Sequence, residues 1–379
     1  LSKRYGIYSA LIYLLIPLNF IHSRLILLEP ITQAFFLASL YAFIRALKKE
    51  NFFLLLLSSF LLALSFLSKP TALASFGAFP AVFISYMITT KGKNTKKIIL
   101  NLFILGALTL ILVLPFILPV LDKFSDLFVW NEGIIIDNLK KNLWLNWWWA
   151  KAYYTLPLMT LILGSLAITL YYKVWKILWI FMWLFSTVFL VSFFAIYFFP
   201  RHMFPYGPPM ALCVGFLFFQ LQEKVKNIFI FFILLVFLFF PLRLVFQIID
   251  SPQNAPIALE DKQQFFEDWT SGWGLVDVAN YLNELSKTQQ ITVITESDGN
   301  FAWSLNNIYT IGNTLIVNDS NLDIPKEGYK PPQSIVSHET YILLNKNPDA
   351  VDELSVKLIK SFPKHSYRRN IKLYKFIEN

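Results

Sequence analysis

Nine apolar stretches, each near the length that crosses a lipid bilayer, occupy the first two thirds of the chain. A membrane-spanning helix needs about 20 mostly apolar residues. The stretches cover residues 7–23, 30–47, 52–68, 70–88, 98–121, 156–172, 177–199, 203–221 and 228–249. Ser68-Lys69-Pro70 separates the third stretch from the fourth, and we interpret it as a tight turn outside the membrane. The pattern therefore predicts a polytopic α-helical membrane protein with about nine spans in residues 1–249.

The composition agrees with a chain that has lipid as a second solvent. Hydrophobic residues make up 56% of the chain and charged residues only 15%, whereas soluble domains carry roughly 25% charged residues. Residues 1–249 hold 21 Lys and Arg against 7 Asp and Glu, and residues 250–379 hold 12 against 17. The basic charge therefore belongs to the membrane part and does not indicate nucleic-acid binding. Cys213 is the single cysteine, which excludes an internal disulfide and a cysteine-based zinc site.

Basic residues are concentrated in alternate loops between the stretches, and this concentration sets the orientation. The positive-inside rule places short loops rich in Lys and Arg on the cytoplasmic side. One set of loops holds 13 basic residues, with only Glu50 and Glu223 against them. The 13 are Lys3, Arg4, Arg45, Lys48, Lys49, Lys91, Lys93, Lys96, Lys97, Lys173, Lys176, Lys224 and Lys226. The rule predicts a protein of the plasma or inner membrane whose residues 250–379 lie outside.

Three single cations, Arg24, Lys69 and Arg201, lie at the external ends of the predicted spans, where the rule does not require positive charge. Long basic side chains often reach from such positions to lipid headgroups. Three cations on one side of the membrane are also what a shared anionic ligand needs, and a lipid phosphate is the natural candidate. The sequence leaves both interpretations open.

The long external connection, residues 122–155, is rich in tryptophan and tyrosine. Indole rings prefer the headgroup region, because their apolar body and polar edge both find partners there. Residues 139–150 (LKKNLWLNWWWA) therefore predict an interfacial helix on the outer leaflet. The alternative is a lid over a lipid or sugar site, with Trp148 and the acidic Glu132 lining the pocket.

The remaining residues, 250–379, predict a small extracytoplasmic α/β domain. Helical periodicity covers residues 274–286, and residues 351–361 predict a second helix. Short strands are expected at residues 291–295, 314–317, 341–344 and 371–376. We find no Gly-rich phosphate loop and no metal-ligand spacing in this part of the sequence, so it does not have the pattern of a catalytic domain.

Two external corners and one turn carry the residues with chemistry. An acid at the mouth of a span is costly in lipid and is by default a functional hypothesis. The three motifs read Ser23-Arg24 with Glu29, Leu67-Ser68-Lys69, and Arg201-His202 with Pro205 and Pro208. In this order they resemble the motifs of GT-C membrane glycosyltransferases, in particular family 39, with its protein O-mannosyltransferase-like and lipid A aminoarabinose transferase-like members. That family carries an S-R-x-x-x-x-[DE] corner, an L-[ST]-K turn and an R-[YH]-x-x-P-x-x-P corner.

The resemblance covers most of residues 1–300, and residues 268–274 (DWTSGWG) resemble the start of the C-terminal domain in bacterial members. It implies an inverting enzyme that takes a sugar from a polyprenyl-phosphate donor on the outer face. The acceptor would be a protein, a lipid or a glycan. On this reading Lys69, Arg201 and Arg24 stabilise the charge of the leaving phosphate, with His202 as a further phosphate contact.

The resemblance also assigns roles to an acid and a tyrosine. Glu29 would be a supporting acid or a metal ligand, and the alternative for it is a plain ion pair with Arg24. Tyr206 would line the pocket or belong to the aromatic belt of the membrane interface. Family members carry two further N-terminal spans, with an acidic motif in the first external loop taken to hold the catalytic base. Because the chain starts at Leu1, we expect a fragment that begins after that loop.

Two other classes of function compete with this interpretation. A transporter or flippase usually has ionisable groups near the bilayer midplane and internal repeats, whereas here the charges gather at one external face. A non-catalytic membrane anchor would present residues 250–379 as a binding module. No cofactor is indicated, and the sequence leaves open whether a divalent metal takes part.

Overall fold

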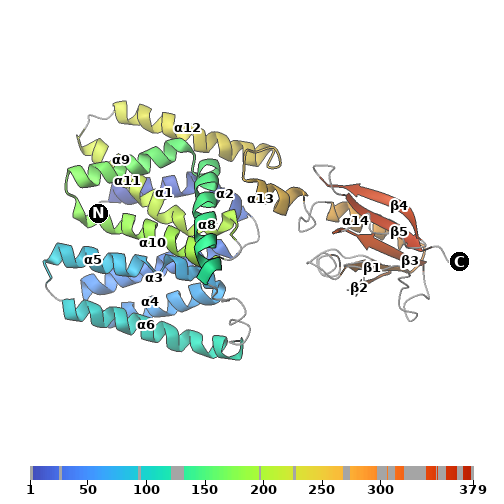
Figure 1. The fold of residues 1–379 in the computed structure, drawn as a ribbon, viewed down its shortest axis with the longest axis horizontal. Helices are drawn as coiled ribbons and strands as arrows, with labels where there is room; N and C mark the ends of the chain where they lie inside the picture. Colours follow the sequence, from blue (N-terminus) through green and yellow to red (C-terminus); the bar gives the residue numbers. More distant parts are fainter. Residues whose placement is uncertain are drawn as a thin grey trace. The chain divides into compact units, whose positions relative to one another are not determined.

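The computed structural model describes residues 3–24, 28–92, 95–120, 132–195, 198–224, 228–267, 274–296, 305, 312–319, 339–346, 348, 356–364 and 370–376. Their contacts divide the chain into two compact units, Leu1–Ala258 and Leu259–Asn379. The first unit is helical and the second is built on a β-sheet (Figure 1).

A helix occupies each of the nine predicted apolar stretches of the first unit. The α-helices are α1 (Lys3–Leu15), α2 (Pro17–Arg24), α3 (Glu29–Lys49), α4 (Phe52–Ser68), α5 (Ala78–Thr90), α6 (Thr95–Ile117), α8 (Glu132–Tyr153), α9 (Leu156–Tyr171), α10 (Leu178–Phe194), α11 (Gly207–Lys224) and α12 (Ile228–Asp250). Short 3-10 segments are η1 (Pro70–Ser75), η2 (Leu118–Val120), η3 (Trp175–Ile177) and η4 (Pro200–Tyr206).

The number of spans is smaller when helix length is considered. Among the described residues, four helical segments are long and apolar enough to cross a membrane, or six if each of two bent helix pairs counts as one span. The predicted count of nine is therefore not confirmed. One reason is that α4 and α10 each have only 17 residues. The architecture is nevertheless that of a multi-pass helical membrane protein.

The first bent pair illustrates how backbone groups are satisfied in apolar surroundings. α1 and α2 meet at Pro17 with a bend of 65°. Proline lacks an N–H, so the carbonyl of Tyr13, four residues earlier, loses its usual helical donor. The Asn19 side chain supplies a donor instead, from Nδ2 to the Tyr13 oxygen at 3.2 Å. Asn19 is buried against Gly207, where a Cβ atom would lie 2.6 Å from Nδ2. The bend is thus packed against the start of α11.

α3 and α4 form an antiparallel hairpin joined by a tight turn at Glu50 and Asn51. Halfway along, Ser39 and Ser58 each donate a hydrogen bond to the other's carbonyl, at 2.7 and 2.8 Å. Small polar side chains of this kind hold helices together within a membrane. Both residues are fully buried. The pairing fixes the register of the hairpin, and so it sets which residue at the end of α4 lies beside the start of α3.

α1 and α11 approach each other closely at Gly215. A Cβ atom there would lie 2.8 Å from the backbone nitrogen and 2.9 Å from the Cα atom of Ser9. We expect Gly215→Ala to destabilise the helical unit by ~1–3 kcal/mol, because the backbone of α1 must move to make room. Thermal unfolding in detergent measures the effect.

Gly106→Ala in α6 is the matched control, since among the described residues no atom beyond the adjoining turns of α6 lies within 4 Å of the Cβ position at Gly106. Alanine favours a helix over glycine by roughly 1 kcal/mol, so this variant should be neutral or slightly stabilised. Equal unfolding temperatures for the two variants would contradict the close contact at Gly215.

α8 runs across the direction of the other helices at one end of the bundle (Figure 1). It meets α9 at an angle of 109°. One face is buried on α10, where the Asn142 side chain donates to the carbonyls of Ser192 and Ala195 at 2.9 and 2.7 Å. The opposite face exposes Trp144, Trp147 and Trp148. A helix that lies along a membrane surface has two such faces, as the predicted interfacial helix requires, although α8 is longer than predicted.

The second unit contains a five-stranded sheet in the order β2-β1-β3-β5-β4. Its strands are β1 (Ile291–Glu296), β2 (Thr314–Asp319), β3 (Glu339–Leu344), β4 (Val356–Pro363) and β5 (Asn370–Phe376). β1 pairs in parallel with β2 and β3, whereas β5 pairs antiparallel with β3 and β4. Three helical segments precede the sheet: α13 (Leu259–Lys262), the π-helical η5 (Gln263–Glu267) and α14 (Leu275–Leu285). α14 packs its apolar face on the strands, which confirms the predicted helix and four predicted strands.

One prediction for this unit is wrong. The sequence predicts a helix over residues 351–361, but Val356–Pro363 form strand β4, and residues 351–355 lie outside the described residues. β4 pairs with β5 from Val356 opposite Phe376 to Pro363 opposite Asn370. The hydrogen bonds of this ladder outweigh the weak local preference of the segment, because strand formation depends mainly on the neighbouring strand.

Candidate functional site

Three of the predicted site residues meet where helical segments end. Glu29 is the first residue of α3, Lys69 links α4 to η1, and Arg201 lies in η4. The Lys69 ammonium group donates a hydrogen bond to Oε1 of Glu29. Nε of Arg201 lies 3.9 Å from the same oxygen. Residues far apart in the sequence thus form one charged cluster, which we call the Glu29 cluster.

The local sequence explains the position of each member of the cluster. A carboxylate in the first turn of a helix is favoured by the helix dipole, as at Glu29 in α3. Lys69 precedes Pro70, and a residue before proline is forced out of the helical conformation. Its backbone is accordingly extended, with φ −162° and ψ 125°, so that α4 ends there. Pro200 is the first residue of η4 and directly precedes Arg201.

The Glu29 cluster carries net positive charge and is partly buried. The Glu29 side chain is 5% exposed, while the side chains of Lys69 and Arg201 are 22% and 23% exposed. Two cations face one carboxylate, so one positive charge is left over. Nε of Arg201 has no hydrogen-bond partner among the described residues. The charges of the cluster are therefore suited to one additional anion.

His202 and the aromatic residues before it support Arg201. The Arg201 guanidinium carbon lies 4.9 Å from the centre of the Phe199 ring, within the range of a cation–π contact. Nδ1 of His202 accepts a hydrogen bond from the Phe199 N–H at 3.2 Å. The ring of His202 also stacks on Phe198, with 6.1 Å between centres. Because Nδ1 is an acceptor, the proton of the neutral imidazole is on Nε2, where it can be donated to a ligand.

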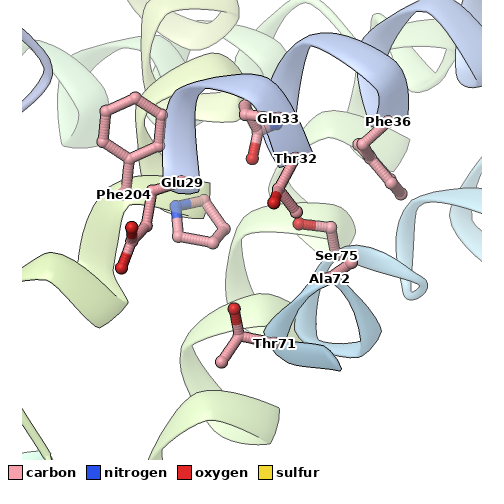
Figure 2. A pocket seen from close by; sticks show the side chains of 9 residues that line it. Glu29, Thr32, Gln33, Phe36, Thr71, Ala72, Ser75 and Phe204 are labelled. Carbon is pink, nitrogen blue, oxygen red and sulfur yellow. The ribbon is translucent and has the colours of Figure 1, made fainter. Parts of the chain in front are cut away.

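A small pocket adjoins the Glu29 cluster (Figure 2). It holds about 10 Å³ of space for water, roughly what a single water molecule needs. Its walls come from the first turns of α3, from η1 and from η4. The lining residues are Glu29, Thr32, Gln33, Phe36, Thr71, Ala72, Ser75, Phe204 and Pro205.

Sequence reasoning found only one lining residue of this pocket, Glu29. A signal was available, because Glu29, Thr32 and Gln33 are three and four residues apart and such positions share one face of a helix. A glutamine and a threonine directly after an acid, at the mouth of a span, could therefore have been read as part of the same site.

The N-terminal part of the chain, which includes Glu29 and Lys69, matches a known protein family. Residues 1–118 match the family model of dolichyl-phosphate-mannose-protein mannosyltransferases. The match confirms the resemblance to GT-C glycosyltransferases and supports a membrane glycosyltransferase in general. No curated protein and no solved structure matches the chain.

The matched region contains two of the three residues of the Glu29 cluster. Glu29 and Lys69 lie within residues 1–118, together with most of the pocket walls, whereas Arg201 and His202 lie beyond them. The part of the chain that matches the family is therefore joined, through the ion pairs at Glu29, to a segment that the family model does not cover.

Four further predicted site residues are Arg24, Glu132, Tyr206 and Trp148. The side chains of Arg24 and Glu132 lie outside the described residues, so the alternative pairing of Arg24 with Glu29 stays a prediction. Tyr206 is buried and donates to Oδ1 of Asn146 at 3.0 Å, which joins η4 to α8. Trp148 is about half exposed on the outer face of α8. Neither Tyr206 nor Trp148 lines the pocket beside Glu29.

The described residues contain no group of three or more His, Cys, Asp or Glu side chains that could hold a metal ion. Within those residues the Glu29 cluster therefore presents cations and one acid, which suits an anionic ligand.

Proposed function

We propose that this protein transfers a sugar from a polyprenyl-phosphate-linked donor to an acceptor hydroxyl at the outer face of the membrane, with inversion at the anomeric carbon. The observation that carries the proposal is the meeting of Lys69 and Arg201 around Glu29, with one positive charge left over. The cluster lies at helix ends, and η4 packs on α8. A lipid phosphate requires positive charge at this level, where the apolar chain meets water.

The positive charge of the Glu29 cluster matters most when the bond between the sugar and the phosphate breaks. The oxygen of the acceptor hydroxyl attacks the anomeric carbon, and the bond between that carbon and the phosphate oxygen breaks. The electron pair of the broken bond goes to the leaving polyprenyl phosphate, and the proton of the acceptor passes to a general base. Lys69 and Arg201 stabilise the charge that develops on the phosphate, which is the usual way in which fixed cations lower such a barrier.

Glu29 has a different role in this proposal. Its carboxylate is held against Lys69 and lies near Arg201, so it orients the two cations instead of taking the proton of the acceptor. Glu29 is therefore a positioning residue, and Lys69 and Arg201 are the groups that touch the donor. His202, whose Nε2 carries the proton of the neutral ring, supplies a further donor to the phosphate.

The donor class and the side of the membrane are supported independently. The name of the matching family includes a dolichyl-phosphate-linked sugar as donor and a protein as acceptor. Dolichyl phosphate is a polyprenyl phosphate. By the positive-inside rule, the loops rich in Lys and Arg favour an outer position for the Glu29 cluster and for residues 250–379. The exposed tryptophans of α8 suit the headgroup region at that side.

Sugar transfer in membranes tests the proposal. The complete reading frame is expressed, and the membranes receive a panel of labelled polyprenyl-phosphate sugars. We expect release of polyprenyl phosphate with at least one donor, and a much lower rate for Glu29→Gln. Glu50→Gln is the matched control, because Glu50 is 58% exposed in its ion pair with Lys97, far along α3 from the site. Folded protein that releases no lipid phosphate from any donor would contradict the proposal and favour a transporter or an anchor.

A further inference from the structure

We propose that the pocket beside Glu29 receives one hydroxyl group of the sugar that is transferred, and that Gln33 selects donors that carry this hydroxyl. The inference rests on the proposed function and adds a determinant of sugar specificity to it. It makes Gln33, which lies four residues after Glu29 on the same face of α3, a residue that touches substrate.

Two buried polar side chains of the pocket keep an atom without a partner. Gln33 is 3% exposed, and its Nε2 has no hydrogen-bond partner among the described residues. Glu29 is 5% exposed, and the same is true of its Oε2. Both residues line the pocket and lie one helical turn apart on α3. A buried polar group without a partner is costly, so a ligand that pairs with both atoms would gain that energy.

The chemistry of the two atoms selects a hydroxyl. The Gln33 amide nitrogen can only donate a hydrogen bond, and the Glu29 carboxylate can only accept one. A hydroxyl oxygen accepts from Gln33, and the hydroxyl hydrogen remains free to donate to a nearby acceptor. An ammonium group could not accept from Gln33 and would also meet the positive charges of Lys69 and Arg201. A methyl group would leave both atoms unpaired.

The size and position of the pocket agree with a sugar hydroxyl. The space of about 10 Å³ admits a group the size of one water molecule and excludes larger substituents. Figure 2 shows polar side chains from α3 and η1 around it, with the ring of Phe204 next to Glu29. Glu29 belongs both to the pocket and to the cation pair. The phosphate of the donor is bonded to the anomeric carbon, so a phosphate at Lys69 brings the ring hydroxyls close to Glu29.

The test combines a Gln33 variant with donors that each lack one hydroxyl. With the wild-type protein, one deoxy donor should lose about threefold to tenfold in kcat/KM, as expected for a hydrogen bond between the uncharged Gln33 amide and a hydroxyl. Gln33→Met should lose a similar factor with the parent donor, and it should no longer distinguish that deoxy donor from the parent. Such non-additivity is the signature of a direct contact.

Two further variants keep the test decisive. Gln222→Met is the matched control, since it makes the same change at the far end of α11, where the Gln222 side chain accepts from Tyr8 at 2.6 Å; it should lower all donors equally or not at all. Thr71→Val changes an exposed position on the pocket wall. It should reduce the same discrimination to a smaller degree, and it serves if Gln33→Met does not fold.

Each other result overturns the inference. If Gln33→Met lowers every donor by the same factor, the pocket holds only a bound water or has a packing role. If the coupling occurs with a deoxy acceptor, the hydroxyl belongs to the acceptor. An active wild-type protein without coupling refutes the inference alone, whereas wild-type protein that transfers no sugar at all refutes the proposed function with it.

Discussion

Arg201→Ala is expected to lower kcat/KM for sugar transfer at least about tenfold, because the leaving phosphate loses a charge-assisted hydrogen bond. The Arg201 side chain is 23% exposed, and its Nε lies 3.9 Å from Oε1 of Glu29, so we expect the exposed part of the side chain to contact the lipid phosphate. Arg201→Lys should retain part of the activity, since it keeps the charge and loses the planar guanidinium. Initial rates of polyprenyl-phosphate release measure both variants.

Arg243→Ala is the matched control for this prediction. Arg243 is an exposed arginine on α12, outside the Glu29 cluster, and its loss should change the rate by less than about twofold. The two variants together separate a specific phosphate contact from a general effect of positive charge at the membrane surface. Near wild-type turnover in Arg201→Ala would remove Arg201 from the site.

The second large effect is expected at the ion pair of Lys69 and Glu29. Lys69→Met leaves the buried carboxylate with only the more distant Arg201, and we expect a loss of ~1–3 kcal/mol in stability as well as a loss of donor binding. Glu29→Gln on the same background removes the unpaired charge. The double variant should therefore recover much of the unfolding temperature while it stays inactive, because no cation is restored for the phosphate.

The exposed pair of Lys97 and Glu50 provides the comparison for this cycle. Its side chains are 48% and 58% exposed at a distance of 2.6 Å, and such surface pairs contribute about 0–1 kcal/mol. Lys97→Met should leave both the unfolding temperature and the transfer rate near the wild-type values. If Lys69→Met behaves like Lys97→Met in both measurements, Lys69 is an ordinary headgroup anchor and the proposed donor contact is wrong.

The sequence predicts most of the helices and the charged residues because both depend on the solvent. Lipid requires long apolar segments with internally satisfied backbones, so each apolar stretch marks a helix. It also makes charges at helix mouths rare, and this rarity singles out Glu29, Lys69 and Arg201. The approach of Lys69 and Arg201 to one carboxylate oxygen of Glu29 could not be predicted, because these contacts join segments that are brought together only by packing.

Two features escaped sequence reasoning for opposite reasons. Gln33 shares a helix face with Glu29, but a single amide in an apolar helix is also common at helix–helix contacts, and its unpaired Nε2 beside a pocket becomes visible only in the structure. Strand β4 escaped because its local pattern is ambiguous and its partner β5 decides the outcome. In the first case the missing information is a neighbouring cavity, and in the second it is a neighbouring strand.

The α3–α4 hairpin has a consequence for how the protein is made. Glu29 and Lys69 lie at the two free ends of this hairpin. Arg201, in contrast, lies 132 residues after Lys69 in the chain. The acid is therefore neutralised as soon as two neighbouring helices have been translated, well before η4 is synthesised. A lone carboxylate costs about 3 kcal/mol at the centre of a membrane helix and less at a helix end, and a counter-ion on the same hairpin lowers this cost for Glu29 before a distant segment is available. We therefore expect Glu29 and Lys69 to pair first and Arg201 to join a pair that is already neutral.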